Sequence, residues 1–438
     1  MHTDITTLTD LSIFNAEDEF SLFNKLNSCI TVNGREQLKI NFYTPLNSIE
    51  EIKGIQQTLQ LIIAKENDWP RQISNGTIMV VEKFYDTIID EIPSHPGKLD
   101  AFTYKIFHGA SFSLVRYSAQ HCFDFVKGMQ LFVKNFLQND VPSPLKKLLA
   151  QVKQALDKPQ FAIVEANAKS AALTMPQLLH FAHFVRYNYK HTMAELLSIY
   201  AQLDAWYGMA MSVKKYKLVF PELIKAETPV LQAEGLYHLM LPQPVAYDVT
   251  LNPDGNFLFL TGANMAGKST FIKSVGAAVF LAHTGMGVPA TKMQLTLFDG
   301  LLSNINVVDN LVKGESYFYN EVQRIKATIQ KVTDGKKWLI LIDELFKGTN
   351  VQDAMKCSAA VIEGFLKIKN SLFILSTHLY EIGEALKVHP NIQFKYFETS
   401  VAGEQLLFSY HLKDGISNDR LGYLILKKEG VVEMLERL

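Results

Sequence analysis

Hydrophobic residues recur at helical spacing through the first half of the chain. Between Ser48 and Ile63, five apolar residues fall on one face of a helix, namely Ile49, Ile52, Ile55, Leu59 and Ile62. This stripe follows a proline, and Ser48 stands where a helix cap is expected, so the segment predicts an amphipathic helix. The same pattern recurs at Gly76–Ile92, Ser111–Leu137, Ser143–Leu156 and Met175–Val213, with proline-rich turns between the stretches. The first half is therefore predicted to be all-α.

The pattern changes after about residue 229. Three short apolar runs, Asn256–Gly262, Lys337–Glu344 and Ser371–His378, are bounded by polar residues and separated by helical stretches. This alternation is typical of a mostly parallel sheet covered by helices on both faces. We therefore predict a multidomain protein, with an all-α domain over residues 1–235 and an α/β domain over residues 236–438, joined near residues 220–234.

Composition narrows the class of protein further. The chain has 438 residues, 48% hydrophobic and 20% charged, which fits a folded protein of two to four domains. The formal net charge of -1 gives no global support for nucleic-acid binding. Three widely spaced cysteines fit a reducing compartment. The N-terminus lacks signal-peptide features, and the longest apolar runs are too short to span a bilayer. The expectation is a cytoplasmic protein without a membrane partner.

The segment TGANMAGKST, residues 261–270, carries a complete phosphate-loop pattern between a predicted strand and a predicted helix. Glycines let the backbone wrap phosphates, whose charge meets the N–H groups of a helix N-terminus. Lys268 is expected to reach the β- and γ-phosphates of a nucleotide, and the Ser269 hydroxyl to ligate Mg²⁺. The predicted nucleotide-binding residues are Gly262, Asn264, Met265, Ala266, Gly267, Lys268, Ser269 and Thr270.

Two acids end the second apolar run. Asp343 is placed to hold Mg²⁺ at the carboxyl end of its strand, and Glu344 to orient or deprotonate the attacking water. An Asp-Glu pair alone is more often a solvated turn, but this pair follows a buried strand downstream of a phosphate loop. His378 ends the third run, and its alternatives are a structural histidine or a contact to the γ-phosphate or the water. Together these features favour an ABC-type P-loop ATPase, in which two subunits close around the nucleotide.

A site shared between subunits requires a serine supplied by the second chain. Ser316 opens a predicted helix within DNLVKGESYFYNEVQRI, residues 309–325. The hydroxyl can cap that helix. The same helix start can instead present its N–H groups and the hydroxyl to the γ-phosphate of a neighbouring subunit. The chemistry of the segment leaves both roles open.

These motifs together resemble those of the MutS family of DNA mismatch-repair ATPases. The resemblance lies in TGANMAGKST with its Asn264-Met265 pair, DNLVKGESYFYNEV, LIDELFKGTN and LSTHLYEI, and extends loosely upstream to residues 21–52. It implies a core and lever domain in front of the ATPase domain, with ATP and Mg²⁺ as cofactors. It also implies catalytic roles for Glu344, His378 and Ser316, with Ser316 acting on the other subunit, and Ser269 and Asp343 as metal ligands.

Departures from the family pattern shape the functional expectation. No counterpart of the mismatch-reading domain, the connector or the C-terminal helix-turn-helix is evident, which implies a short form. Residues 242–249 do not clearly present an aromatic ring that stacks on adenine. The leading hypothesis is a homodimeric ATPase of mismatch repair or recombination control that clamps mismatched or branched DNA. The alternative is an ATP-gated module that holds another repair protein and does not bind DNA. A transporter ATPase is disfavoured by the fused helical half and the Asn264-Met265 pair.

Overall fold

The computed structural model describes residues 1–138, 140–306, 317–402, 405–417, 427 and 430–436. The chain divides into two compact units. The helical unit consists of Leu26–Tyr43 and Gly54–Lys215, and the sheet unit consists of Met1–Lys25, Thr44–Lys53 and Tyr216–Leu438. The chain thus combines helices with mixed sheets in a multidomain arrangement.

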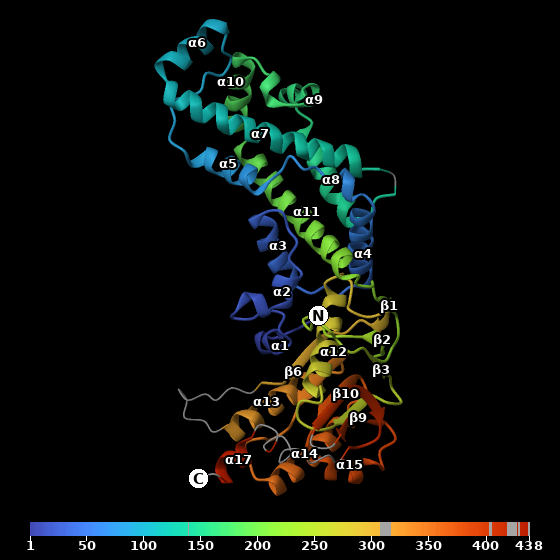
Figure 1. Cartoon of the computed structure of the whole chain (residues 1–438). Helices are drawn as coiled ribbons and strands as arrows, with labels where there is room; N and C mark the ends of the chain where they lie inside the picture. Colours follow the sequence, from blue (N-terminus) through green and yellow to red (C-terminus); the bar gives the residue numbers. More distant parts are fainter. Residues whose placement is uncertain (139, 307–316, 403–404, 418–426, 428–429, 437–438) are drawn as a thin grey trace. The chain divides into compact units, whose positions relative to one another are not determined.

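The helical unit is built on two long helices, α7 (Gly109–Phe136) and α11 (Lys190–Tyr216), against which shorter helices pack (Figure 1). The shorter helices are α3 (Val32–Tyr43), α5 (Asn75–Asp86), α6 (Lys98–Phe107), α8 (Ser143–Leu156), α9 (Ala162–Ala166) and α10 (Met175–His183). Helix α4 (Ile49–Ala64) begins in the sheet unit and continues into the helical unit. A π-helical turn, η5 (Phe184–Asn188), separates α10 from α11. The stretch Met175–Val213 is therefore a broken helix, although its apolar periodicity is continuous.

A buried carboxylate fixes the start of α3 within the helical unit. Asp204 of α11 is fully buried and accepts hydrogen bonds from the backbone N–H groups of Ile30 and Thr31, both at 2.8 Å. The Thr31 hydroxyl donates to the same carboxylate at 2.6 Å. Burial raises the pKa of Asp204 despite these three donors. Asp204 thus fixes the two residues that precede α3, while the Thr31 hydroxyl caps the helix locally by accepting the Gly34 N–H at 3.1 Å.

The sheet unit contains two sheets. The described strands are β1 (Glu222–Ile224), β2 (Leu231–Leu236), β3 (Tyr247–Leu251), β4 (Phe257–Thr261), β5 (Lys292–Thr296), β6 (Gly300–Asn304), β7 (Trp338–Asp343), β8 (Ser371–Ser376), β9 (Ile392–Ala402) and β10 (Gln405–Asp414). The smaller sheet has the order β1-β5-β2-β3, and the larger has the order β10-β9-β4-β8-β7-β6. All neighbours in the larger sheet are parallel except β9 and β10. Strands β4, β7 and β8 lie where the three apolar runs predict them.

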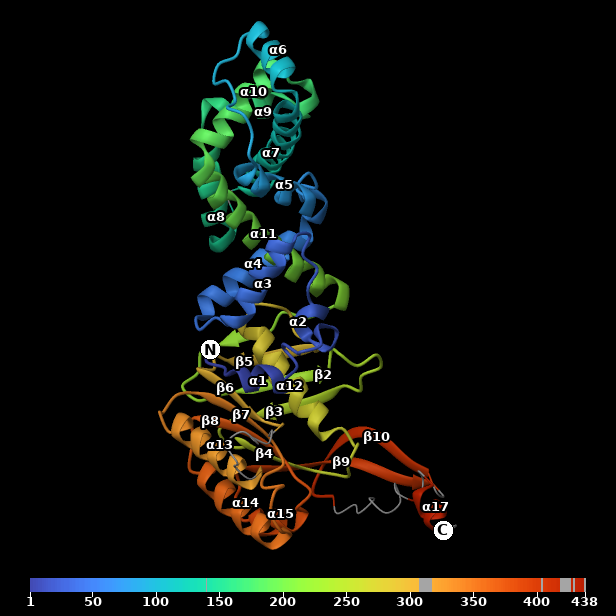
Figure 2. The ribbon, with the colours of Figure 1, turned by 90° about the vertical axis from the view of Figure 1, so that its left-hand side faces the viewer.

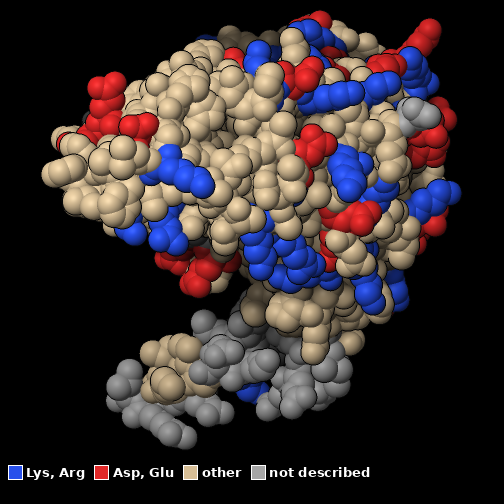
Figure 3. Space-filling model, turned by 90° about the horizontal axis from the view of Figure 1, so that it is seen from above, with Lys and Arg blue, Asp and Glu red and all other residues tan. Residues whose placement is uncertain are grey.

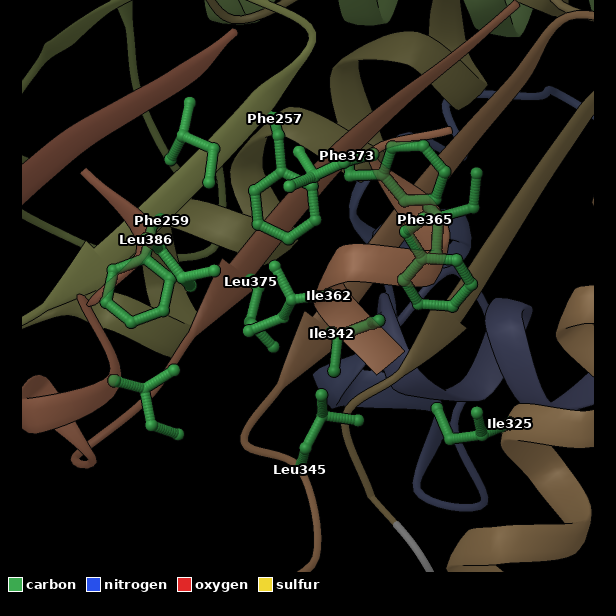
Figure 4. Close-up of a cluster of buried hydrophobic side chains, with 14 of the residues drawn as sticks. Phe257, Phe259, Ile325, Ile342, Leu345, Ile362, Phe365, Phe373, Leu375 and Leu386 are labelled. Carbon is green, nitrogen blue, oxygen red and sulfur yellow. The ribbon is translucent and has the colours of Figure 1, made fainter. Parts of the chain in front are cut away.

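Helices cover both faces of the larger sheet (Figure 2). On one face, α12 (Lys268–His283) packs against β7 and β8. On the other, α13 (Tyr317–Val332), α14 (Val351–Phe365) and α15 (Tyr380–Leu386) bury one hydrophobic cluster against the strands. Figure 4 shows this cluster, in which Phe257 and Phe259 of β4 meet Phe373 and Leu375 of β8. Alternate residues of each strand point to opposite faces, so two-sided burial explains the uninterrupted apolar runs.

The units differ from the predicted ranges 1–235 and 236–438. The first 25 residues belong to the sheet unit, where α1 (Ile5–Asp10) lies against β6. Buried Asp10 accepts hydrogen bonds from the Ser303 hydroxyl at 2.6 Å and from the backbone N–H groups of Ile305 and Asn306 at 3.0 and 3.1 Å. Strand β1 also falls before residue 236, and β2 runs across that boundary. The helical periodicity of the N-terminal residues carries no information on which unit they pack against.

Within the described residues, no helix combines the length and the hydropathy that a membrane crossing requires.

Candidate functional site at the carboxyl edge of the larger sheet

The strand order brings the predicted motifs to one edge of the larger sheet. The segment Gly262–Thr270 follows β4, Asp343 ends β7, and His378 comes two residues after β8. Strand β8 lies between β4 and β7, with Leu260 and Asp343 both in register with Ser376. Because the strands are parallel, their carboxyl ends meet at this edge, where α/β proteins commonly bind ligands. Three segments distant in the sequence therefore converge.

The Gly262–Thr270 loop uses backbone conformations that suit glycine. Gly262 has φ 136° and Gly267 has φ 109°, and α12 begins directly after Gly267. A Cβ on Gly262 would also come within 3.3 Å of the Phe397 carbonyl oxygen. Met265 adopts φ 66° and is 71% exposed. The N-terminus of α12 directly follows the loop, and the free N–H groups of a helix N-terminus favour anions.

Lys268 is the buried cation of the loop, with 6% of its surface exposed. Its Nζ donates to the carbonyl oxygens of Gly262 at 2.7 Å and Ala263 at 2.9 Å, and lies 3.4 Å from Nε2 of His378. Burial lowers the pKa of Lys268 to about 8, although the carboxylates of Asp343 and Glu344 favour the charged form. Burial, and then the charge of Lys268, also lower the pKa of His378.

Ser269 and Asp343 meet directly. The Ser269 hydroxyl donates to Oδ2 of Asp343 at 2.5 Å, and the Ser376 hydroxyl donates to Oδ1. A hydroxyl and a carboxylate that converge in this way are hard oxygen donors, which are the ligands Mg²⁺ prefers. The donor set therefore fits the predicted metal.

Glu344 follows in a strained position. Its φ is 68°, which is unusual for a residue with a side chain, and its backbone N–H donates to the Ser376 carbonyl at 2.9 Å. Its Oε2 pairs with Nζ of Lys347 at 3.5 Å. Both side chains reach the cavity that Lys268 and Asp343 line. Two carboxylates, two lysines and a histidine thus line one cavity.

The cavity has a volume of about 510 Å³. The predicted residues that line it are Asn264, Met265, Gly267, Lys268, Ser269, Thr270, Asp343, Glu344 and His378. Gly262 and Ala266 shape the loop without lining the cavity. Ser316 lies outside the described residues, and only the helix that follows it, α13, is seen.

Sequence reasoning did not identify two aromatic residues of this cavity. Tyr247 comes from β3, within the segment 242–249, and its ring packs edge-on against Phe271 and Phe397. Tyr410 comes from β10, where a register irregularity and φ 55° turn the chain. Tyr247 stands in an ordinary alternating strand, and Tyr410 depends on an irregularity that no local pattern predicts. Together with Leu241 they give the cavity lining an apolar part as well as a charged one.

The fold and the cavity define an α/β protein with a strand–loop–helix turn beside an acidic strand end. Comparison with known proteins agrees with this class. The family model for MutS domain V matches residues 258–435. The chain is 26% identical over 297 residues to the DNA mismatch repair protein MutS of Petrotoga mobilis, covering 66% of this chain and 35% of that protein. It is 28% identical over 247 residues to the MutS protein of Thermotoga maritima, covering 56% and 30%.

Residues 258–435 of the chain thus match a MutS domain V, and over 56% to 66% of its length the chain is similar to curated MutS proteins. It spans about a third of the length of these curated relatives.

Proposed function

We propose that this chain is an ATP hydrolase that couples ATP binding and hydrolysis, in a homodimer, to clamping on DNA in mismatch repair or recombination control. The observation that carries the proposal is the convergence of Lys268, Ser269, Asp343, Glu344 and His378 on one cavity from three separate segments. The match to MutS domain V over the same residues supports it.

Each side chain has a role that its position supports. The Gly262–Thr270 loop and the start of α12 cradle the phosphates, and Lys268 exchanges its two loop carbonyls for phosphate oxygens. Glu344 orients and deprotonates the attacking water once nucleotide draws Lys347 away from it. His378, 3.4 Å from Lys268, contacts the γ-phosphate or that water.

Ser269 and Asp343 hold Mg²⁺, with Ser376 orienting the second carboxylate oxygen. Bound there, the ion neutralises the charge that develops on the phosphates. The apolar side of the cavity, with Tyr247 and Tyr410, suits the base of the nucleotide.

The proposed homodimer rests on the role assigned to Ser316. Each hydrolysis site needs a hydroxyl near the γ-phosphate, and we assign it to Ser316 of the second subunit. Mixed dimers test this assignment: a Lys268→Ala chain paired with a Ser316→Ala chain retains one intact composite site and is expected to hydrolyse ATP, whereas either mutant alone is not. No recovery in the mixed dimer contradicts the arrangement.

One observation favours the alternative of an ATP-gated module that binds a protein partner. Helix α6 exposes an apolar stripe of Leu99, Phe102, Ile106 and Phe107, which are 74%, 55%, 58% and 79% exposed. On the face drawn in Figure 3, basic and acidic side chains are interspersed, without a basic stripe that would follow a DNA backbone. DNA binding therefore needs a direct test.

The test measures ATP turnover and DNA binding by the purified chain. Matched, mismatched and branched duplexes are compared with and without ATP at two salt concentrations, since phosphate contacts weaken steeply with salt. Tight binding to one structure that responds to ATP supports the clamp. ATP hydrolysis without DNA binding at low salt supports the partner-binding module instead, absence of ATP hydrolysis rejects the proposed hydrolase, and absence of ATP binding rejects both.

A further inference from the structure

The segment Glu344–Thr349 carries the proposed catalytic carboxylate. Its backbone adopts a conformation that its own residues do not favour. Glu344 and Phe346 both have positive φ, at 68° and 59°, and neither is glycine. Residues with side chains adopt this region only where surrounding contacts impose it. The contacts that hold this loop therefore decide where the Glu344 carboxylate points.

Glu321 of α13 supplies the main polar contact. Its Oε1 accepts the backbone N–H of Lys347 at 3.0 Å, and its Oε2 accepts that of Gly348 at 3.1 Å. The Glu321 residue is 5% exposed. One buried carboxylate thus satisfies two consecutive N–H groups of the loop, including that of the lysine whose side chain pairs with Glu344.

The loop and α13 approach each other as closely as their backbones allow. A Cβ on Gly348 would stand 2.7 Å from the backbone nitrogen of Phe318. The rings of Phe318 and Phe346 lie 5.7 Å apart. Leu345 shares a buried cluster with Ile325 of α13, and Figure 4 shows both side chains. The first turns of α13 therefore form the surface on which the loop packs.

The other end of the loop is held by the sheet, through the bond from the Glu344 N–H to the Ser376 carbonyl. Glu344 is thus fixed on one side by β8 and on the other, through Lys347, by Glu321. Burial raises the pKa of Glu321, and the two N–H donors oppose this effect.

We propose that Glu321 is a positioning residue for ATP hydrolysis, which holds the Glu344-bearing loop on α13 without touching the nucleotide. The inference rests on the proposed function, because it assigns Glu321 a part in the reaction that Glu344 performs. Glu321 does not line the cavity. Its removal should therefore slow turnover while leaving nucleotide affinity unchanged.

The experiment compares Glu321→Gln and Glu321→Asp with the full-length wild-type chain. Glutamine keeps the size but offers one acceptor oxygen and an NH₂ group, so one loop N–H loses its acceptor. Aspartate keeps both oxygens on a shorter arm. Thr328→Val is the matched control, because Thr328 is also buried on α13 but bonds Asn304 and not the loop. Readouts are kcat, KM, thermal stability and hydrogen exchange at the Lys347 and Gly348 amides.

We expect Glu321→Gln to lower kcat by about 10- to 100-fold, as small misplacements of catalytic groups do. KM should stay unchanged, the two amides should exchange faster, and Glu321→Asp should recover part of the rate. Thr328→Val should keep the wild-type kcat. An unchanged kcat in Glu321→Gln overturns the inference while wild-type hydrolysis leaves the proposed function intact. Parallel losses of kcat, ATP affinity and stability, without recovery by aspartate, make Glu321 merely structural and overturn it too. A wild-type chain without ATP hydrolysis rejects the proposed function itself.

Discussion

Two loops of the sheet unit occupy equivalent places yet differ in how far glycine supplies their conformation. Gly262–Thr270 follows β4 and Glu344–Thr349 follows β7, both at the carboxyl edge of the larger sheet. In the first loop, glycines at φ 136° and 109° accept the turn without strain, and only Met265, at φ 66°, carries a side chain at positive φ. In the second, Glu344 and Phe346 have positive φ, and the contacts of Glu321 and Gly348 with their neighbours keep them there.

The difference bears on how each loop can be perturbed. The first loop encodes its shape locally, so changes to its own side chains should alter ligand binding and little else. The second loop takes its shape from α13, so changes at a distance should alter turnover while binding persists. Substitutions in the two loops can therefore separate ATP binding from ATP hydrolysis.

The largest effect is expected in the first loop. Lys268→Ala should abolish measurable ATP binding, because charge-assisted bonds to phosphate contribute about 1.5–3 kcal/mol each. Equilibrium binding of a fluorescent ATP analogue measures this loss. Lys273→Ala, on the same helix α12 but outside the cavity lining, removes the same charge and should bind normally. Retained ATP affinity in Lys268→Ala would show that the loop is not part of the nucleotide site.

In the second loop, Glu344→Gln should bind ATP normally and hydrolyse it about 100-fold or more slowly, since general-base contributions have this size. Single-turnover hydrolysis measured beside ATP affinity separates the two effects. Glu363→Gln, an exposed position on α14, serves as the control. Near-normal turnover in Glu344→Gln would contradict the assignment of Glu344 as the catalytic base.

Gly348→Ala should disturb the packing of the second loop against α13. The added methyl would meet the backbone nitrogen of Phe318, and such overpacking costs about 1–3 kcal/mol. The expected outcome is lower stability in urea unfolding together with slower turnover and retained ATP affinity. Gly364→Ala in α14 is the control, because a Cβ there meets nothing within 4 Å. Equal stability of the two variants would show that the close approach to α13 is unimportant.

The smallest effect concerns the protonation of Lys268. Its pKa of about 8 lies below the pKa of lysine in the unfolded chain. From about pH 8 upward, the unfolded chain therefore binds more protons than the folded chain. Raising the pH above about 8 thus stabilises the nucleotide-free fold through this group. Phosphates favour the ammonium form, so ATP binding at pH 8 should take up about half a proton. Calorimetry in buffers of different ionisation enthalpy measures the uptake. Equal uptake at pH 6.5, where Lys268 is already charged, would point to another group.

The sequence predicted the parts of the site that are local. The phosphate-loop spacing, the acidic end of β7 and the helices α4, α7 and α8 follow from short-range patterns. Their convergence follows from one further rule, that parallel strands bring their carboxyl ends to one edge. Tyr410 could not be predicted, since a register irregularity in β10 turns it into the cavity. The unit boundary at Tyr216 and the packing of α1 against β6 were not predicted either, because both depend on tertiary contacts.

What the sequence determined by itself is the turn of the Gly262–Thr270 loop and the lysine and hydroxyl side chains that follow it, because glycine conformations and their neighbours act within a few positions. What only the tertiary structure decided is the position of Glu344. Its loop is strained, and Glu321, 23 positions earlier in the chain, holds it through two backbone N–H groups. A side chain that binds backbone leaves no pattern in the sequence of the segment it binds, because every non-proline residue offers the same N–H.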